Sequence, residues 1–428
     1  MSVDVVDVVG IGAGPSNLGL AAAIDERNRA GGEPLTVRIF ERKPSFGWHP
    51  GMLLDGATMQ IAFLKDLVTL RNPRSPFGFL SYLEERGRLV DFVNHQTFFP
   101  TRIEFTDYLG WVADSVDAGI DYGSDVTRID RCDGGDGARF EVAVTGPNGA
   151  EVVRARSVVV GSGLRERLPE WAYGPRMFHN HRILEHLAAL DVRDESPRFL
   201  VVGGGQSAAE VLRHLHSEYP AAVVESVFNS YGFQPADDSP YANRVFDPDA
   251  VDDFFGAAPA VRSELMDRHR TTNYGCVDLE LIQELYAIEY TEKVRGRRRL
   301  WMHPVTEVIA AREDGNGVDV SVRERLTGEV WTRRYAAVVC ATGFRSVGAS
   351  EVLAHWRIAD NSVTVRRDYQ LAVDGDPVPG LYVQGATEET HGLASTLLSN
   401  IAVRSGEILD SLLMDAPSTV APAGSENE

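Results

Sequence analysis

The feature that most constrains this fold is a unit of a short apolar strand, a glycine turn and a helix, which the chain uses twice. Near the N-terminus, a β-branched stretch at 4–9 leads into GIGAGPSNLGLAAAI. The spacing of Gly10 and Gly12 lets the backbone approach a pyrophosphate, whose charge then lies at the N-terminus of a helix that begins near Pro15. Proline replaces the third glycine of the usual fingerprint, and it suits a first helical turn.

The strand that follows this first unit, LTVRIFE, ends in Glu41. An acidic side chain at that place can accept hydrogen bonds from the ribose hydroxyls of an adenosine. A lone glycine fingerprint can also be an ordinary connection between a strand and a helix. The strand, the glycines, the helix and the terminal acid together favour a dinucleotide site.

The second unit is PRFLVVGGGQSAAEVLRHLH, in which Gly203, Gly205 and Ala208 carry the fingerprint spacing. It predicts a second dinucleotide site in the same chain. Asn229 and Ser230 stand where the next strand ends, so no acid is present there. The absence of a carboxylate removes repulsion against a 2′-phosphate and favours NADP over NAD.

Two further glycine stretches, VVVGSGLRERLP at 158–169 and AAVVCATGFRS at 336–346, each follow an apolar strand. In flavoproteins with two dinucleotide sites, such strand ends mark the crossings between the lobes. We therefore expect an α/β fold with Rossmann-like FAD and NADPH lobes. The expected division is a first FAD part at 1–165, an NADPH lobe at 166–340 with a substrate-covering insertion at about 236–300, a second FAD part at 341–415 that also closes the substrate site, and a disordered tail at 416–428.

Composition excludes several classes of function. The chain has 42 Lys+Arg against 62 Asp+Glu, a net charge of −20, which argues against a nucleic-acid partner. Its three cysteines, Cys132, Cys276 and Cys340, include no CxxC pair, so neither a disulfide framework nor a disulfide reductase is expected. We see no signal peptide, membrane span or metal-ligand cluster, and we expect a soluble cytoplasmic protein.

Longer motifs make the chain recognisable from end to end, apart from the tail. It resembles the flavin-dependent N-hydroxylating monooxygenases of the ornithine and lysine type. The segments that carry the resemblance are GIGAGPSNLGLA, FGWHPGMLLDGATMQIAFLKDLVTLRNPRSPFGFLSYLEERGRL, FFPTRIEFTDYLGWVA, VVGGGQSAAEV, DDSPYANRVFDP, TTNYGCVDLELI, CATGFR and THGLASTLLSNIAVRSGEI.

This resemblance implies an enzyme that uses FAD, NADPH and O₂ to hydroxylate the terminal amine of a small amino acid through a C4a-hydroperoxyflavin. L-Ornithine is the first expectation, for siderophore or peptide natural-product assembly. The same chemistry on L-lysine, on a diamine or on aspartate stays open, as does a flavin monooxygenase that oxygenates carbon or sulfur. Such enzymes are often dimers or tetramers, so a homo-oligomer is expected.

Lys65 lies in an apolar run, MQIAFLKDL, where a charge without a partner is costly. Pairing with a nearby acid such as Asp66 is the ordinary explanation. The resemblance instead assigns Lys65 to the α-carboxylate of the substrate, and it places Gln60, in the same strand-like segment, over the flavin. Alone, Gln60 would be read as an amide bonded to backbone.

The resemblance also gives Asn243 and Asn273 to the α-amino and carboxylate groups of the substrate, because an amide offers both a donor and an acceptor. Ser399 is expected near the substrate head. Without the motif, each asparagine is a turn residue and Ser399 a helix-start hydroxyl. The chain carries Gly275 and Cys276 where many ornithine enzymes carry Ser and Val, which leaves the preferred chain length or head group open.

The fingerprints and the resemblance together give three sets of expected site residues. The catalytic residues are Gln60, Lys65 and Asn273. The FAD residues are Gly10, Gly12, Gly14, Pro15, Ser16, Asn17, Glu41, Lys43, Trp48, His49, Gln60, Arg102 and Leu398. The NADPH residues are Gly203, Gly205, Gln206, Ser207, Glu210, Asn229 and Ser230.

Overall fold

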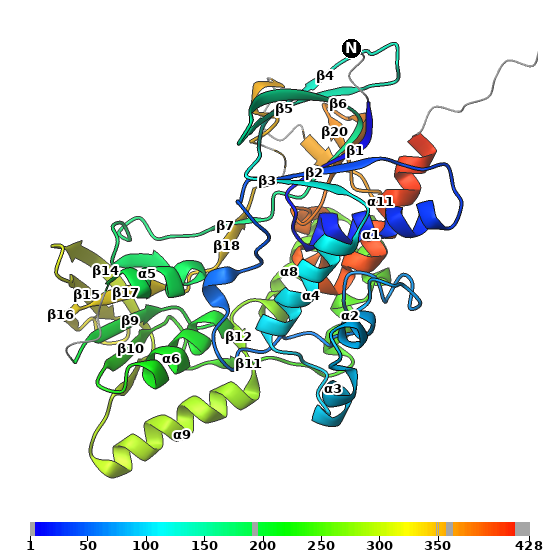
Figure 1. Ribbon diagram of the computed structural model, residues 1–428. Helices are drawn as coiled ribbons and strands as arrows, with labels where there is room; N and C mark the ends of the chain where they lie inside the picture. Colours follow the sequence, from blue (N-terminus) through cyan, green and yellow to red (C-terminus); the bar gives the residue numbers. More distant parts are fainter. Residues whose placement is uncertain (1–4, 191–195, 348, 350, 357–362, 416–428) are drawn as a thin grey trace, which may run out of the picture.

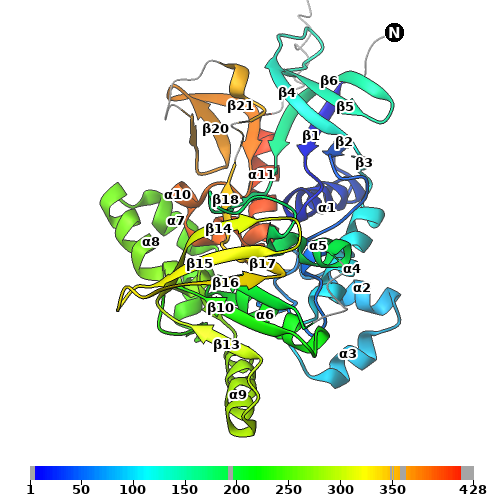
Figure 2. The ribbon, with the colours of Figure 1, turned by 90° about the vertical axis from the view of Figure 1, so that its left-hand side faces the viewer.

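The computed structural model describes residues 5–190, 196–347, 349, 351–356 and 363–415. Within them the chain forms two lobes, one built on a mixed sheet and the other on a parallel sheet (Figures 1 and 2). The tail expected at 416–428 lies outside the described residues. In the described part of the chain, we find no helix with the length and apolar content that a membrane span requires.

The first sheet has the strand order β19-β20-β21-β6-β1-β2-β3, and β4 and β5 extend it from β6 as antiparallel strands. Its strands are β1 (Val6–Ile11), β2 (Val37–Glu41), β3 (Gly119–Tyr122), β4 (Asp125–Arg131), β5 (Phe140–Gly146), β6 (Gly149–Val160), β19 (Val363–Val365), β20 (Gln370–Val373) and β21 (Asp376–Val383). The central strand β1 pairs in parallel with β2 and β6. Strands from both ends of the chain therefore complete one sheet.

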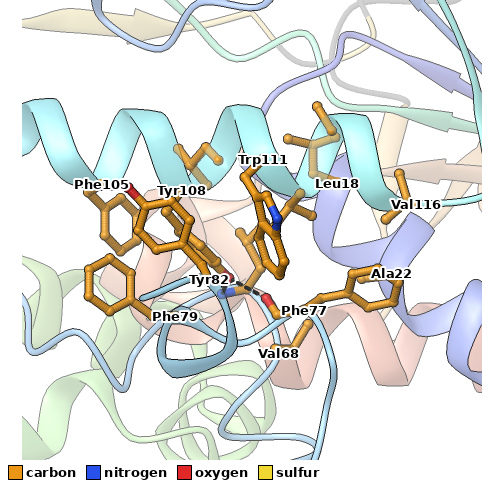
Figure 3. Close-up of a cluster of buried hydrophobic side chains, with 14 of the residues drawn as sticks. Leu18, Ala22, Val68, Phe77, Phe79, Tyr82, Phe105, Tyr108, Trp111 and Val116 are labelled. Atoms are coloured by element: carbon orange, nitrogen blue, oxygen red, sulfur yellow. Dashed lines mark hydrogen bonds between the residues drawn. The ribbon is translucent and has the colours of Figure 1, made fainter. Parts of the chain in front are cut away.

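The helices of this lobe pack around an aromatic cluster (Figure 3). The helices are α1 (Pro15–Arg29), α2 (Phe79–Glu85), α3 (Leu89–His95), α4 (Arg102–Ser115) and α11 (Ile401–Asp415). Phe79, Phe105 and Tyr108 are fully buried, and the Tyr108 hydroxyl donates to the carbonyl of Phe77 at 3.0 Å. This packing fixes α4, whose first residue is Arg102.

The second sheet has the order β13-β10-β9-β17-β8, and a three-stranded antiparallel sheet, β14-β15-β16, packs against it. The strands are β8 (Met177–His179), β9 (Arg198–Val202), β10 (Val223–Val227), β13 (Leu300–His303), β14 (Thr306–Glu313), β15 (Val318–Glu324), β16 (Val330–Tyr335) and β17 (Ala337–Cys340). Helices α5 (Ile183–Leu190) and α6 (Gln206–Glu218) belong to this lobe. Both glycine fingerprints thus lie between a strand and a helix, β1 and α1 or β9 and α6, as predicted.

The chain crosses between the lobes twice, and the two crossings pair with each other. The crossing strands β7 (Leu164–Glu166) and β18 (Phe344–Ser346) form an antiparallel ribbon. This ribbon confirms the prediction that the glycine stretches at 158–169 and 336–346 lie at the crossings. Because the strands of the first sheet come from 6–160 and 363–383 and those of the second from 177–340, we propose the domain division expected from the sequence.

The segment predicted as one substrate-covering insertion, 236–300, divides between two environments. Its first part holds η3 (Ala242–Phe246), α7 (Asp249–Gly256) and α8 (Pro259–Asn273), which lie against α10 (Glu388–His391) and η5 (Leu393–Thr396). Its second part, α9 (Leu279–Arg295), packs on α6 through Leu281 and Leu285. The substrate-covering role expected for 236–300 stays a prediction, and the helical pattern gave no sign that α9 joins the core of the second lobe.

Several short elements complete the structure. They are η1 (Pro50–Met52), η2 (Asn180–Arg182), η4 (Ala354–Trp356), η6 (Leu398–Asn400) and the pair β11 (Gln234–Pro235) and β12 (Cys276–Val277). The segment around Gln60 and Lys65, read as strand-like, consists of turns and bends. Its backbone is held by the N–H groups of Met59 and Phe63, which donate to Pro100 and Phe98 at 2.8 and 2.9 Å.

The two glycine turns press against the two crossings. Gly12 has φ +88°, and a Cβ built on it would lie 2.6 Å from the carbonyl oxygen of Gly161. Gly203 has φ +144°, and its Cβ would lie 2.3 Å from the carbonyl oxygen of Ala341. Only glycine combines this backbone conformation with this close approach.

We predict that Gly12→Ala lowers the free energy of unfolding by about 3 kcal/mol or more. The cost of placing alanine at this φ adds to the cost of the clash between its Cβ and the backbone. Gly14→Ala is the matched control, since its Cβ would meet nothing within 4 Å and its φ is −83°. The control should lose at most about 1 kcal/mol, the scale of a helix-cap substitution. Urea unfolding of the ligand-free protein measures both, and equal losses would contradict the close-approach argument.

Candidate active site

Both glycine turns leave room for a phosphate beside a helix N-terminus. The cap residues Gly14 of α1 and Gly205 of α6 make no side-chain capping bond. The backbone N–H groups of the first helical turns are therefore open to an anionic ligand, which the helix dipole also favours. The chain thus fits a dinucleotide at each turn.

Polar side chains form hydrogen bonds with the backbone and side chains of the first turn. Asn17 is buried, and its amide donates to the carbonyls of Ile11 and Gly12 at 3.0 and 2.8 Å. Ser16 accepts a hydrogen bond from the buried Arg404 at 3.1 Å. Glu41 accepts from the N–H of Ala13 at 2.9 Å, and its remaining lone pairs can still receive a ribose hydroxyl.

The other residues expected at the two cofactors take different positions. Asn229 is exposed beyond β10, and Ser230 lies beside the turn, with its hydroxyl 3.7 Å from a Cβ built on Gly204. Lys43, expected at FAD, donates through its ammonium to the carbonyl of Gly47. Ser207 faces the space between the lobes described next.

A cavity of about 270 Å³ lies where the lobes meet. It is lined by Trp48, His49, Met52, Thr58, Met59, Gln60, Ile61, Arg102, Asn180, His181, Ser207, Phe344, Thr396, Leu397 and Leu398. The lining includes the predicted residues Trp48, His49, Gln60, Arg102 and Leu398 of the FAD set, together with Ser207 of the NADPH set. The structure therefore brings the two sets of cofactor residues to one place.

One histidine that the sequence reading missed, His181, lines this cavity beside the expected His49. The ring of His181 lies 4.9 Å from that of His49 and 5.6 Å from that of Phe344, between ring centroids. His179 ends β8 and lies 4.8 Å from Phe344. The signal was available, since ligand-contacting residues follow the carboxyl ends of parallel strands. The segment MFHNHR has that position but no glycine fingerprint.

These histidines are neutral near pH 7. Burial lowers the pKa of His49 to about 3, and the positive charges of Arg102 and Lys43 act in the same direction. His49 keeps some exposed surface because its ring faces the cavity, while protein atoms enclose the rest of it. Burial also lowers the pKa of His179 and of His181.

A buried ion pair ties the lobes together beside the cavity. Arg102, at the start of α4, donates through both terminal nitrogens to the carboxylate of Glu210 on α6, at 2.8 Å each. Glu210 is 1% exposed. Its carboxylate thus faces the other lobe, and the role expected for Glu210 at NADPH stays a prediction. Arg102 also donates to the carbonyl of Met52 at 3.0 Å.

Gln206 extends this contact to the segment that follows α8. Its amide nitrogen donates to Glu210 at 3.1 Å and to Asp278 at 2.8 Å, and its amide oxygen accepts from the N–H of Asp278 at 2.9 Å. Gln60 donates to the other oxygen of Asp278 at 3.3 Å. Burial raises the pKa of Asp278, and the two amide donors oppose that change. Gln206 therefore joins protein groups across the interface, a different position from the one expected at NADPH.

Lys65 is half-buried, and its ammonium has no ion pair or hydrogen bond among the described residues. The ordinary explanation, pairing with Asp66, does not hold. The carboxylate of Asp66 instead accepts from the N–H groups of Val68, Thr69 and Phe79 at 3.0, 2.6 and 2.8 Å. Lys65 is thus a cation available to a ligand.

The remaining expected substrate residues have free polar atoms. Asn243 in η3 and Asn273 at the end of α8 are half-buried, and neither amide has a side-chain partner in the described part of the chain. The hydroxyl of Ser399 in η6 and Nε2 of His181 are buried and have no hydrogen-bond partner among the residues that the structure describes. Unsatisfied buried polar atoms are costly, so these positions fit a polar ligand.

A second cavity, of about 330 Å³, lies between η3, α7, α8 and α10. None of the residues expected at a cofactor or a substrate lines it. His391 does line it, and burial lowers the pKa of this histidine to about 4. The ring of His391 stacks on Tyr369 at 4.3 Å, in agreement with a structural role.

Comparison with known proteins supplies independent findings. The family model described as L-lysine 6-monooxygenase/L-ornithine 5-monooxygenase matches residues 4–346. The L-ornithine N(5)-monooxygenase of Pseudomonas aeruginosa is 37% identical, over 97% of this chain and 96% of the relative. The enzyme of the same name from Burkholderia cepacia is 39% identical, over 91% and 90%.

Solved structures agree with these relatives. The ornithine N-hydroxylase of Kutzneria sp. 744, solved with reduced FAD, NADP⁺ and L-ornithine, has a TM-score of 0.90 and 41% identity, over 96% of this chain and 99% of that one. The L-lysine 6-monooxygenase of Pseudomonas syringae has a TM-score of 0.81 and 32% identity, over 96% and 100%. The overall fold class expected from the sequence is confirmed.

We predict that Arg102→Met lowers the free energy of unfolding by about 3–5 kcal/mol, because it leaves the buried Glu210 charge without its partner. The double variant Arg102→Met/Glu210→Leu should lose less than Arg102→Met alone, since no buried charge remains. Urea unfolding of the single and double variants measures the coupling. Additive losses would show that the two side chains do not depend on each other.

The burial of His49 predicts a pH dependence of stability. The unfolded chain binds a proton at His49 as the pH falls through about 6.5, whereas the folded protein binds it only near pH 3. As the pH is lowered between these two values, the free energy of unfolding should therefore decrease. This residue contributes at most about 1.4 kcal/mol per pH unit. Urea titrations of His49→Gln should give a flatter decline than the unsubstituted protein, and parallel curves would count against the assignment.

Proposed function

Because the chain belongs to the L-lysine 6-monooxygenase/L-ornithine 5-monooxygenase family, we propose that it uses FAD, NADPH and O₂ to hydroxylate the side-chain amine of L-ornithine. The observation that carries this proposal is the 41% identity, over 96% of this chain, to the Kutzneria enzyme solved with reduced FAD, NADP⁺ and L-ornithine. The product is an N-hydroxylated amino acid, the precursor of a hydroxamate in siderophore or peptide natural-product assembly.

The two glycine turns are the proposed cofactor sites. Gly12 and Gly14 admit the FAD pyrophosphate at α1, and Glu41 receives its ribose. Gly203 and Gly205 do the same for NADPH at α6. When bound, these cofactors supply the reducing equivalents and the activated oxygen of the reaction. The chain itself contributes binding, orientation and the exclusion of water.

The substrate is proposed to be held at its amino-acid head. Lys65, a cation without a described partner, binds the α-carboxylate. Asn243 and Asn273 receive the head through amide groups that are likewise free. Ser399 offers a buried hydroxyl that has no partner in the described part of the chain. Gln60, which donates to Asp278 and lines the cavity, is proposed to face the flavin.

The charges around the cavity suit an uncharged amine, which is the form that can attack oxygen. Arg102 is neutralised by Glu210, and His49 holds no proton near pH 7. The carboxylate of Glu210 is in turn paired with Arg102, so it is not a free anion that would hold the amine as an ammonium ion. The amine proton must leave to solvent before the reaction, so we expect the rate to rise with pH.

The test of the proposed activity is mass spectrometry of products after incubation with NADPH and each candidate substrate. Ornithine is expected to gain one oxygen atom on its side-chain nitrogen, ahead of lysine, aspartate, putrescine and cadaverine. Formation of hydrogen peroxide alone with every amine, or oxygenation of sulfides or ketones instead, would overturn the proposal. An enzyme that consumes NADPH works where that nucleotide is regenerated, so we also propose the cytoplasm as its compartment.

We predict that Lys65→Met lowers kcat/KM for ornithine by about 10²–10³-fold, mainly through KM, because the substrate carboxylate loses its buried partner. Putrescine is the internal control, since it has the same terminal amine and no carboxylate. Its kcat/KM should change little, and flavin reduction by NADPH should persist. An equal loss of kcat/KM on both substrates would mean that Lys65 does not bind the carboxylate.

A further inference from the structure

Arg404 of α11 is a charged side chain that is only 1% exposed. Arginine stays protonated in proteins, and a buried charge without a counter-charge is costly. Among the described residues, no carboxylate forms an ion pair with this guanidinium. The charge of Glu407 acts on Arg404, but that carboxylate is already paired with Arg367 at 2.7 Å. The chain therefore holds a buried positive charge that its described acids do not neutralise.

The guanidinium of Arg404 binds groups at the first glycine turn and beside the cavity between the lobes. It donates to the hydroxyl of Ser16 at 3.1 Å, to the amide oxygen of Gln384 at 3.3 Å and to the carbonyl of Ser395 at 2.6 Å. Ser16 lies in the first turn of α1. Ser395 directly precedes the segment 396–398, which lines the cavity. One cation thus joins the expected pyrophosphate site to the wall of the cavity.

A guanidinium has only donors, so Arg404 fixes the direction of the hydrogen bonds that follow from it. Because the oxygen of Gln384 accepts, its amide nitrogen is the group that donates to the oxygen of Asn17, at 3.1 Å. The amide nitrogen of Asn17 then donates to the carbonyls of Ile11 and Gly12. Gln384 and Asn17 are each 2% exposed, so solvent does not replace these partners. The backbone of the first glycine turn is thereby held from α11.

The bond from Arg404 also decides what the hydroxyl of Ser16 can do. A hydroxyl has a single proton to donate, and here its oxygen accepts from the guanidinium. No acceptor for that proton is found among the residues that the structure describes. Ser16 is half-buried and lies beside the open N–H groups at the start of α1. Its proton is therefore available to an acceptor where the pyrophosphate is expected.

We propose that Arg404 is a positioning residue for the pyrophosphate of FAD. It acts through Ser16, whose hydroxyl it orients as a donor to a phosphate oxygen, and it supplies a buried positive charge that the pyrophosphate neutralises. This inference rests on the FAD site proposed at α1. It gives the last helix of the described chain, which lies beside α1 (Figures 1 and 2), a part in binding a cofactor that the N-terminal turn receives.

The experiment is a titration of the ligand-free chain with FAD, followed through the quenching of FAD fluorescence on binding. Ser16→Ala should raise the dissociation constant for FAD by about 10- to 100-fold, the scale of one hydrogen bond to a charged group. Arg404→Gln should raise it by at least as much, because glutamine carries no charge. Arg404→Lys keeps a cation and should bind FAD more tightly than Arg404→Gln. Ser16→Ala should cost less affinity in the Arg404→Gln background than in the unsubstituted chain.

Arg71→Gln is the matched control, because Arg71 also connects α1 with α11. It donates to Glu26 of α1 at 2.9 Å, and a Cβ built on Gly406 of α11 would lie 2.9 Å from its side chain. Its hydrogen bonds go to Glu26 and not to the glycine turn. This variant should have a lower free energy of unfolding in urea and an unchanged affinity for FAD.

Three results would overturn the proposal. The first is an unchanged affinity for FAD in Ser16→Ala or in both variants of Arg404. The second is an equal loss from Ser16→Ala in the two backgrounds, which would show that Arg404 does not act through Ser16. The third is a loss in Arg71→Gln as large as that in Arg404→Gln, which would assign the effect to a general loosening of the lobe. Failure of the unsubstituted chain to bind FAD would overturn the proposed function as well, so the two failures can be told apart.

Discussion

The close approach of two glycine turns to two backbone crossings is the contact on which this architecture depends. Gly12 meets the carbonyl of Gly161, and Gly203 meets that of Ala341, with no space for a side chain in either place. Each turn is thereby held at the point where the chain leaves its sheet. Because the crossings pair as one ribbon, β7 with β18, the two turns are held in a defined relation to each other. The cavity between the lobes is a consequence of that relation.

The basic side chains in and near the proposed site differ in whether their charge is available to a ligand. The guanidinium of Arg102 is engaged by a carboxylate and a backbone carbonyl, and the nearby imidazoles are neutral. Lys65, by contrast, is left without a described partner. The protein therefore neutralises the positive charge beside the proposed flavin and keeps one available for the proposed carboxylate. Removing the proton from the amine is left to the solvent.

The sequence predicted the parts of this structure that follow from local rules. Glycine spacing located both turns, and Glu41 ends its strand as expected, because each depends on a few adjacent residues. The partners of Gln206 and Glu210 could not be predicted, since Arg102 and Asp278 reach them from distant segments. His179 and His181 were missed for another reason, because their segment follows the end of a strand but carries no glycine fingerprint. The apolar run around Lys65 was read as strand-like, but an apolar pattern alone cannot distinguish a strand from the turns and bends that the structure shows there.

The first lobe is discontinuous, and this has a consequence for synthesis. Strand β21 pairs with β6, and α11 packs on α1 so tightly that a Cβ on Gly19 would lie 2.7 Å from Ile401. The N-terminal segment cannot complete its sheet or its helical cover until the last helix has left the ribosome, whereas the second lobe is continuous and can fold earlier. The flavin site is then finished last, after the nucleotide lobe that it faces has already formed.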